Sequence, residues 1–178
     1  MAEPQRDLVI NLVHATDPEI GRMLWLFQDT RTRTLQSLEG LDPSRVAVVP
    51  DHFENSIGAL LYHVAVIEAD WLYSEVREQE MPGDVLSLFP DGVRDDTGAL
   101  VDPRTRGLDD HLKVLDQVRA LVLETYQPMT LADFRRARQL PQYDVTPEWV
   151  LHHLMQHEAE HRGHIESLRH FIEVTSRS

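Results

Sequence analysis

The stretch TPEWVLHHLMQHEAEHRGHIESLRHFI, residues 146–172, decides the fold. It opens with Thr146-Pro147-Glu148, a capping residue followed by proline at the first helical position. Apolar residues then recur at helical spacing as far as Ile172, and no further proline interrupts them. A helix with one long apolar face needs partners of similar length, so this stretch predicts a helical bundle.

Three further segments carry the same helical periodicity. They run from Asp17 toward Gly40, from Asn55 to Pro82, and from about Thr105 to Tyr126. Four helices of roughly 20 to 28 residues would each span about 30 to 42 Å, so they can pack side by side. We therefore expect an all-α protein built as a four-helix bundle.

The connection between the second and third predicted helices sets the order of the bundle. It covers about residues 80–104, is rich in Pro, Gly and Asp, and is long enough to traverse the bundle from end to end. A crossover of this kind predicts that the second and third helices run parallel. Outside the helices, only residues 135–140 suggest a short strand. The chain, residues 1–178, fits the size of a single domain.

Composition narrows the classes of function. Seventeen Lys and Arg against thirty Asp and Glu give a net charge of −13, and no basic patch is present, so nucleic acid is not an expected partner. No apolar stretch approaches the roughly 18 residues of a membrane span, and we expect a cytoplasmic protein without a signal peptide. The chain has no cysteine, which excludes disulfides, thiolate metal ligands and a cysteine nucleophile.

Histidines are concentrated in the last predicted helix. His153, His157 and His161 follow one another at a spacing of four, and His164 returns to the same side. Val150 and other apolar residues share this stripe, so the four imidazoles are predicted to face the core. A hydrogen-bonded core histidine remains the alternative for each of them. Burying several imidazoles without partners would cost about 1 to 3 kcal/mol each, and coordination of a metal would remove this cost.

A third metal ligand is predicted in the second helix. His63 lies in its middle, on the predicted core face, where another helix can approach it. His63, His157 and His161 would hold a divalent ion from two helices and leave one position open, as in catalytic zinc sites. Asp70 lies on nearly the same face as His63; it either orients a ligand or is a solvated charge, and we favour the second interpretation.

The sequence H-E-x-x-H at residues 157–161 is also the pattern of zinc peptidases, in which Glu158 would be the general base. Only seventeen residues follow His161. The two glutamates among them that could act as a third ligand, Glu166 and Glu173, continue the same predicted helix and cannot fold back onto the ion. We therefore interpret Glu158 as a helix residue. Arg162 is interpreted as an ion-pair residue of the helix flank, and Gly163 as a point of close backbone approach.

Two segments together resemble a known family. NSIGALLYHVAVIEADWL (residues 55–72) and TPEWVLHHLMQHEAEHRGHI (residues 146–165) are similar to the DinB/YfiT-like superfamily of metalloenzymes. Its members place one histidine in the second helix and two in the last helix, before Arg-Gly. The resemblance therefore marks His63, His157 and His161 as the metal ligands. It departs at His164, where the family usually has glutamine.

The resemblance implies an up-down-down-up four-helix bundle, often a homodimer, that binds zinc or nickel. Characterised relatives are thiol S-transferases that use low-molecular-weight thiols such as bacillithiol or mycothiol. The expected partners are therefore a small thiol, as cosubstrate, and an electrophile.

Two other functions stay open. One is a hydrolase that uses metal-activated water, and the other is a non-enzymatic metal-binding protein in which a fourth ligand such as His153 closes the site. No catalytic acid or base is assigned, because Tyr62, Asp70, Tyr73 and Glu158 cannot be ranked from the sequence.

Overall fold

The computed structural model describes residues 9–175, so both ends of the predicted domain 1–178 lie outside the described part. Within it, the chain is mainly helical, with one very small sheet. The elements are α1 (Pro18–Leu38), a 3₁₀ turn (Pro43–Arg45), α2 (Ile57–Trp71) with a π-helical extension (Leu72–Val76), α3 (Gly83–Leu86), α4 (Leu108–Tyr126), α5 (Leu131–Phe134), β1 (Arg138–Gln139), β2 (Asp144–Val145) and α6 (Pro147–Thr175).

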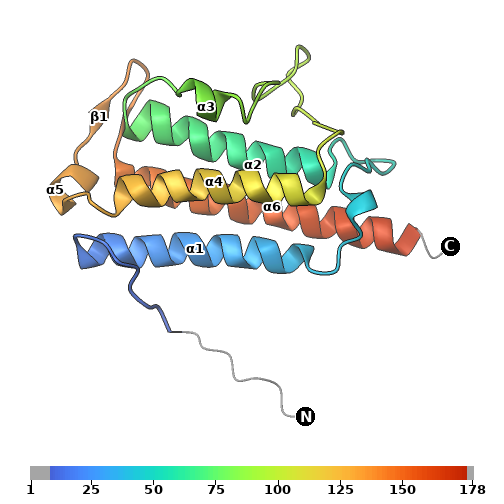
Figure 1. Ribbon diagram of the computed structural model, residues 1–178, viewed down its shortest axis with the longest axis horizontal. Helices are drawn as coiled ribbons and strands as arrows, with labels where there is room; N and C mark the ends of the chain where they lie inside the picture. Colours follow the sequence, from blue (N-terminus) through green and yellow to red (C-terminus); the bar gives the residue numbers. More distant parts are fainter. Residues whose placement is uncertain (1–8, 176–178) are drawn as a thin grey trace, which may run out of the picture.

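Four long helices, α1, α2, α4 and α6, lie side by side as a bundle (Figure 1). Helices α1 and α6 run in one direction, while α2 and α4 run in the other. The predicted up-down-down-up order is therefore confirmed, and so is the long crossover between α2 and α4. Helix α6 packs against α1 and α2, and α2 packs against α4.

Apolar residues from all four long helices fill the space between them. Phe27, Leu61, Leu115 and Leu151 are each 0% exposed and come from α1, α2, α4 and α6 in turn. The strand predicted within 135–140 is present as β1, which pairs antiparallel with β2. None of the described helices is both long and apolar enough to cross a membrane.

Four buried charged residues, one from each long helix, form an ion quartet in the centre of the bundle. They are Arg31, Glu68, Arg119 and Glu158, and none is more than 7% exposed. Arg31 donates to Glu158 at 2.7 Å and to Glu68 at 2.9 Å, and Arg119 donates to the same two carboxylates at 2.8 Å each. Two positive and two negative charges cancel, which makes the burial tolerable.

The guanidinium groups of the ion quartet also bind the backbone. Arg31 donates to the carbonyl of Leu115 at 3.0 Å, and Arg119 donates to the carbonyl of Phe27 at 2.7 Å. Burial alone would raise the pKa of Glu158, but the charges of Arg31 and Arg119 outweigh it and lower this pKa below its ordinary value. Glu158 therefore stays charged at neutral pH, and its ion pairs help to fix the helices relative to one another.

Candidate metal centre

The start of α2 explains why His63 is held firmly. Ser56 caps the helix, because its hydroxyl accepts a hydrogen bond from the amide of Ala59 at 3.0 Å. Gly58 lets another segment approach, since a Cβ there would lie 3.2 Å from the carbonyl oxygen of Val46. Two turns later, His63 is only 6% exposed. The sequence Ser-Ile-Gly therefore fixes the first turn of α2, and this sets the position of His63 two turns later.

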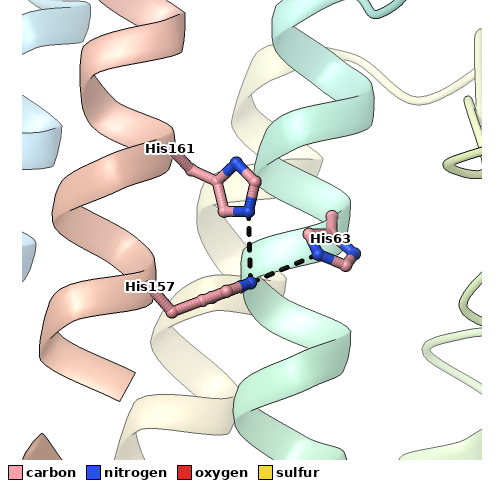
Figure 2. Close-up of side chains that lie close together, drawn as sticks. All are labelled: His63, His157 and His161. Carbon is pink, nitrogen blue, oxygen red and sulfur yellow. Dashed lines mark hydrogen bonds between the residues drawn. The ribbon is translucent and has the colours of Figure 1, made fainter. Parts of the chain in front are cut away.

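Helix α6 supplies the other two imidazoles. His157 and His161 lie one turn apart and are half-buried. The Nε2 atom of His157 lies 3.2 Å from Nε2 of His63 and 3.1 Å from Nε2 of His161, as Figure 2 shows. One nitrogen from each of the three rings lies within 4.8 Å of the others. Three residues that the sequence assigned to one site are therefore brought together.

The distances between these nitrogens fit a shared metal ion better than hydrogen bonds alone. A single ring nitrogen carries either one N–H or one lone pair in the plane of its ring, so Nε2 of His157 is poorly suited to two ring-nitrogen neighbours. Around an ion in tetrahedral geometry, imidazole nitrogens would be about 3.3 Å apart. The observed separations of 3.1 and 3.2 Å are close to this value. The three histidines could therefore hold a divalent metal.

The surroundings keep all three imidazoles neutral. Burial, then the neighbouring His161 and Arg94, lowers the pKa of His63 to about 4. Burial, then the adjacent imidazoles, lowers the pKa of His157 to about 3, and burial also lowers the pKa of His161. At neutral pH each ring therefore presents a lone pair, which is the form that binds metals.

His164 contacts the outer side of this group. It is exposed, and its Nδ1 lies 3.4 Å from Nδ1 of His161, on the opposite side of that ring from the nitrogen that meets His157. If Nε2 of His161 binds a metal, its Nδ1 carries the proton and can donate it to Nδ1 of His164. The prediction that His164 faces the core is wrong, because it lies beyond the buried face of α6.

We expect His164→Ala to weaken zinc binding by about tenfold, at the low end of the roughly 10–100-fold effect of residues that orient a metal ligand. His164→Gln should retain most of the affinity, because its amide oxygen can accept from Nδ1–H of His161. Zinc affinity can be measured by competition with a chelating dye, with His170→Ala as an exposed control on the same helix. Equal affinities for His164→Ala and the wild type would show that the contact does not orient His161.

The buried face of α6 runs beside the histidine row. Leu154, Glu158 and Ile165 are buried, whereas His153 and His157 are only half-buried and lie along one border of that face. Glu158 therefore points into the bundle and belongs to the ion quartet. This position agrees with the interpretation that Glu158 is not a peptidase base. The sequence did not reveal that Arg31 and Arg119 are its partners.

The other residues weighed in the sequence have the following surroundings. Arg162 lies 4.0 Å from Glu166 at the helix flank, as interpreted. Gly163 has no atom within 4 Å of a Cβ built on it, so the predicted close backbone approach there is wrong. Asp70 is half-buried rather than fully solvated, and its side chain is 3.5 Å from the hydroxyl of Ser74.

A cavity of about 550 Å³ opens beside the three histidines. The crossover contributes Arg94 to its wall, where the guanidinium donates to the carbonyl of Gly98 at 2.8 Å. None of Tyr62, Asp70, Tyr73 and Glu158 lines this cavity. His153 does, but its ring stacks on Trp149 at 5.1 Å and 8°, and it is not among the imidazoles that converge. One side of the histidine group therefore faces open space.

Comparison with known proteins adds a family to this geometry. The family model described as the DinB superfamily matches residues 26–165, a range that includes all three converging histidines. No curated protein matches the chain.

Proposed function

Since the chain belongs to the DinB superfamily, we propose that it is a metal-dependent transferase in which a low-molecular-weight thiol, of the bacillithiol or mycothiol type, attacks an electrophilic substrate. The observation that carries this proposal is the convergence of three neutral imidazoles, from two helices, on the wall of a cavity of about 550 Å³. Three nitrogen ligands beside an open space are typical of catalytic rather than structural zinc sites.

The chemistry follows from what the chain contains. A zinc or nickel ion held by His63, His157 and His161 would offer a free position to a thiol sulfur and lower the pKa of that thiol. In the reaction, the thiol loses its proton to solvent and its sulfur forms a bond to an electrophilic carbon. The leaving group departs with the electron pair of the bond that breaks. Because the chain has no cysteine, the sulfur has to come from the cosubstrate.

Arg94 supports a thiol that carries a negative charge. Two charged side chains, Arg94 and Glu54, line the cavity, and Arg94 is the one whose charge contributes to lowering the pKa of His63. A guanidinium beside the metal ligands can bind a carboxylate of the cosubstrate through charge-assisted hydrogen bonds. The chain thus offers a metal centre for the sulfur and an arginine for an anionic group of the same molecule.

The proposal is tested by titrating the nickel-loaded or cobalt-loaded protein with bacillithiol and with mycothiol. Binding of the sulfur to the metal should produce a sulfur-to-metal charge-transfer band, and the loaded protein should speed the consumption of phenacyl bromide by the same thiol. Arg94→Ala should raise the Kd of a carboxylate-carrying thiol by about tenfold, the effect of losing roughly 1.4 kcal/mol, while leaving metal content unchanged.

A clear negative result is available for this proposal. If neither thiol changes the metal spectrum and phenacyl bromide is not consumed faster, the transferase function fails. Thiol-independent turnover of p-nitrophenyl acetate by the metal-loaded protein, lost on metal removal, would instead favour the hydrolase.

A further inference from the structure

A group of aromatic rings continues from the three histidines toward the β1–β2 end of the bundle. His153 lies next to His157, with ring centroids 6.0 Å apart, and it contacts two tryptophans whose own ring centroids are 5.5 Å apart. Its centroid is 4.3 Å from that of Trp71 and 5.1 Å from that of Trp149. Trp71 comes from the end of α2 and Trp149 from the first turn of α6, so the aromatic group bridges the same two helices as the histidines.

Beyond these rings lies a second cavity of about 370 Å³. Trp71 lines both this cavity and the cavity beside the histidines, so the two adjoin at its ring. Trp149, Tyr143 and Val145 form the apolar walls of the second cavity, with Ala137 at its edge. Trp149 is 48% exposed and Tyr143 is 45% exposed, so two large aromatic side chains beside the second cavity remain accessible to a ligand.

Tyr143, one of the exposed aromatic side chains of the second cavity, is fixed by a hydrogen bond. Tyr143 lies in the turn between β1 and β2, and its hydroxyl donates to the carboxylate of Glu75 at 2.8 Å. This hydrogen bond, with burial and the negative charges nearby, raises the pKa of Tyr143 to about 12, so the hydroxyl remains a donor at neutral pH. An exposed aromatic wall fixed in this way is typical of a ligand site that forms before the ligand arrives.

We propose that the second cavity binds the apolar, flat part of the electrophilic substrate, an aromatic or conjugated group, and that Trp71 guides its reactive carbon toward the three histidines. This inference rests on the proposed function and names its substrate class. A volume of about 370 Å³ accommodates one small ring system, within the roughly 300–1,000 Å³ of ligand pockets. Flat rings pack favourably against tryptophan, by about 0.5–1.5 kcal/mol beyond the area they bury.

Binding can be measured without metal, thiol or turnover. Acetophenone, an unreactive ketone with the ring of phenacyl bromide, should quench the fluorescence of Trp71 and Trp149 in the metal-free protein. The titration is made in a Trp25→Phe background, because Trp25 lines neither cavity and would add a constant signal. We expect saturable quenching that is lost in a further Trp149→Ala variant.

A pair of matched variants tests the position of the ligand. Ala137→Phe places a ring at the edge of the cavity and should weaken acetophenone binding by about tenfold or more, since the added ring takes space that the ligand needs. Ala132→Phe makes the same change at an exposed position of α5 that does not line the cavity, and it should leave binding unchanged. In the loaded enzyme, Ala137→Phe should raise KM for phenacyl bromide but not for the small electrophile iodoacetamide.

The outcomes separate this inference from the transferase proposal. Absence of saturable quenching, or equal binding by the two phenylalanine variants, overturns the aromatic subsite even if thiols bind the metal. If Ala137→Phe dissociates a dimer and the wild-type protein does not bind acetophenone, the apolar wall is a subunit contact and the aromatic subsite is also overturned. Normal acetophenone binding in a protein that shows no thiol chemistry would support the subsite while the proposed function fails.

Discussion

Glu158→Gln is expected to lower the free energy of unfolding by about 3–5 kcal/mol, the range found when one partner of a buried ion pair is removed. The glutamine has nearly the same shape but no charge, so the guanidinium groups of Arg31 and Arg119 would share one carboxylate, that of Glu68. Each would remain almost fully buried. Urea unfolding followed by circular dichroism measures the loss.

Glu160→Gln is the matched control for this experiment. It makes the same chemical change two residues away on the same helix, at an exposed position, and should alter stability by no more than about 0.5 kcal/mol. The comparison of these two variants also tests whether Glu158 is a structural residue or the general base of a peptidase. A peptidase base should be dispensable for folding, so a Glu158→Gln protein of wild-type stability would contradict the role of Glu158 in the ion quartet.

The metal centre should respond to the same substitution only indirectly. Glu158 follows His157 in the chain and Glu68 lies five residues after His63, so the ion quartet holds the two helices that carry the three histidines at a fixed distance. A Glu158→Leu, Arg31→Met double variant removes one charge of each sign. It should be less destabilised than Glu158→Leu alone, because the quartet stays neutral.

Helix starts were the most predictable part of the fold, because their signals are local. The predicted starts at Asp17, Asn55 and Thr146 lie at or next to the observed caps. These are Asp17, Ser56 and Thr146, and each accepts a hydrogen bond from an amide two or three residues further on. The start of α4 was placed about three residues too early, near Thr105. Its actual cap, Gly107, has no side chain that could signal the boundary.

The ion quartet illustrates what sequence reasoning missed. Arg31 follows the core residue Phe27 by four positions, and Glu158 follows Leu154 by four, so both lie on apolar stripes. A charged residue on an apolar stripe was the signal in the sequence that these two side chains would be buried. The partners, however, are as far as 127 residues apart in the chain, and no local pattern states which charges meet. Arg94 was missed for a similar reason, since nothing in the crossover sequence indicates which of its residues lies beside the three histidines.

His63→Ala, His157→Ala and His161→Ala are each expected to weaken zinc binding by more than the roughly 10–100-fold that the loss of a supporting residue causes. The reason is geometric: the three ring nitrogens lie within 4.8 Å of one another, and two imidazoles alone leave the ion bound mainly by water. Zinc at 100 times its Kd should stabilise the wild-type protein by about 2.7 kcal/mol. At the same zinc concentration, the three variants should show almost no rise in Tm.

His152→Ala is the control for metal binding by the α6 histidines. His152 is exposed on the same helix and touches none of the three converging rings, so its variant should keep the full zinc-dependent rise in Tm. The substitution His63→Ala also removes Nδ1 of His63, a buried nitrogen that has no hydrogen-bond partner. A His63→Ala protein that still binds zinc as the wild type does would exclude α2 from the site and place all the ligands on α6.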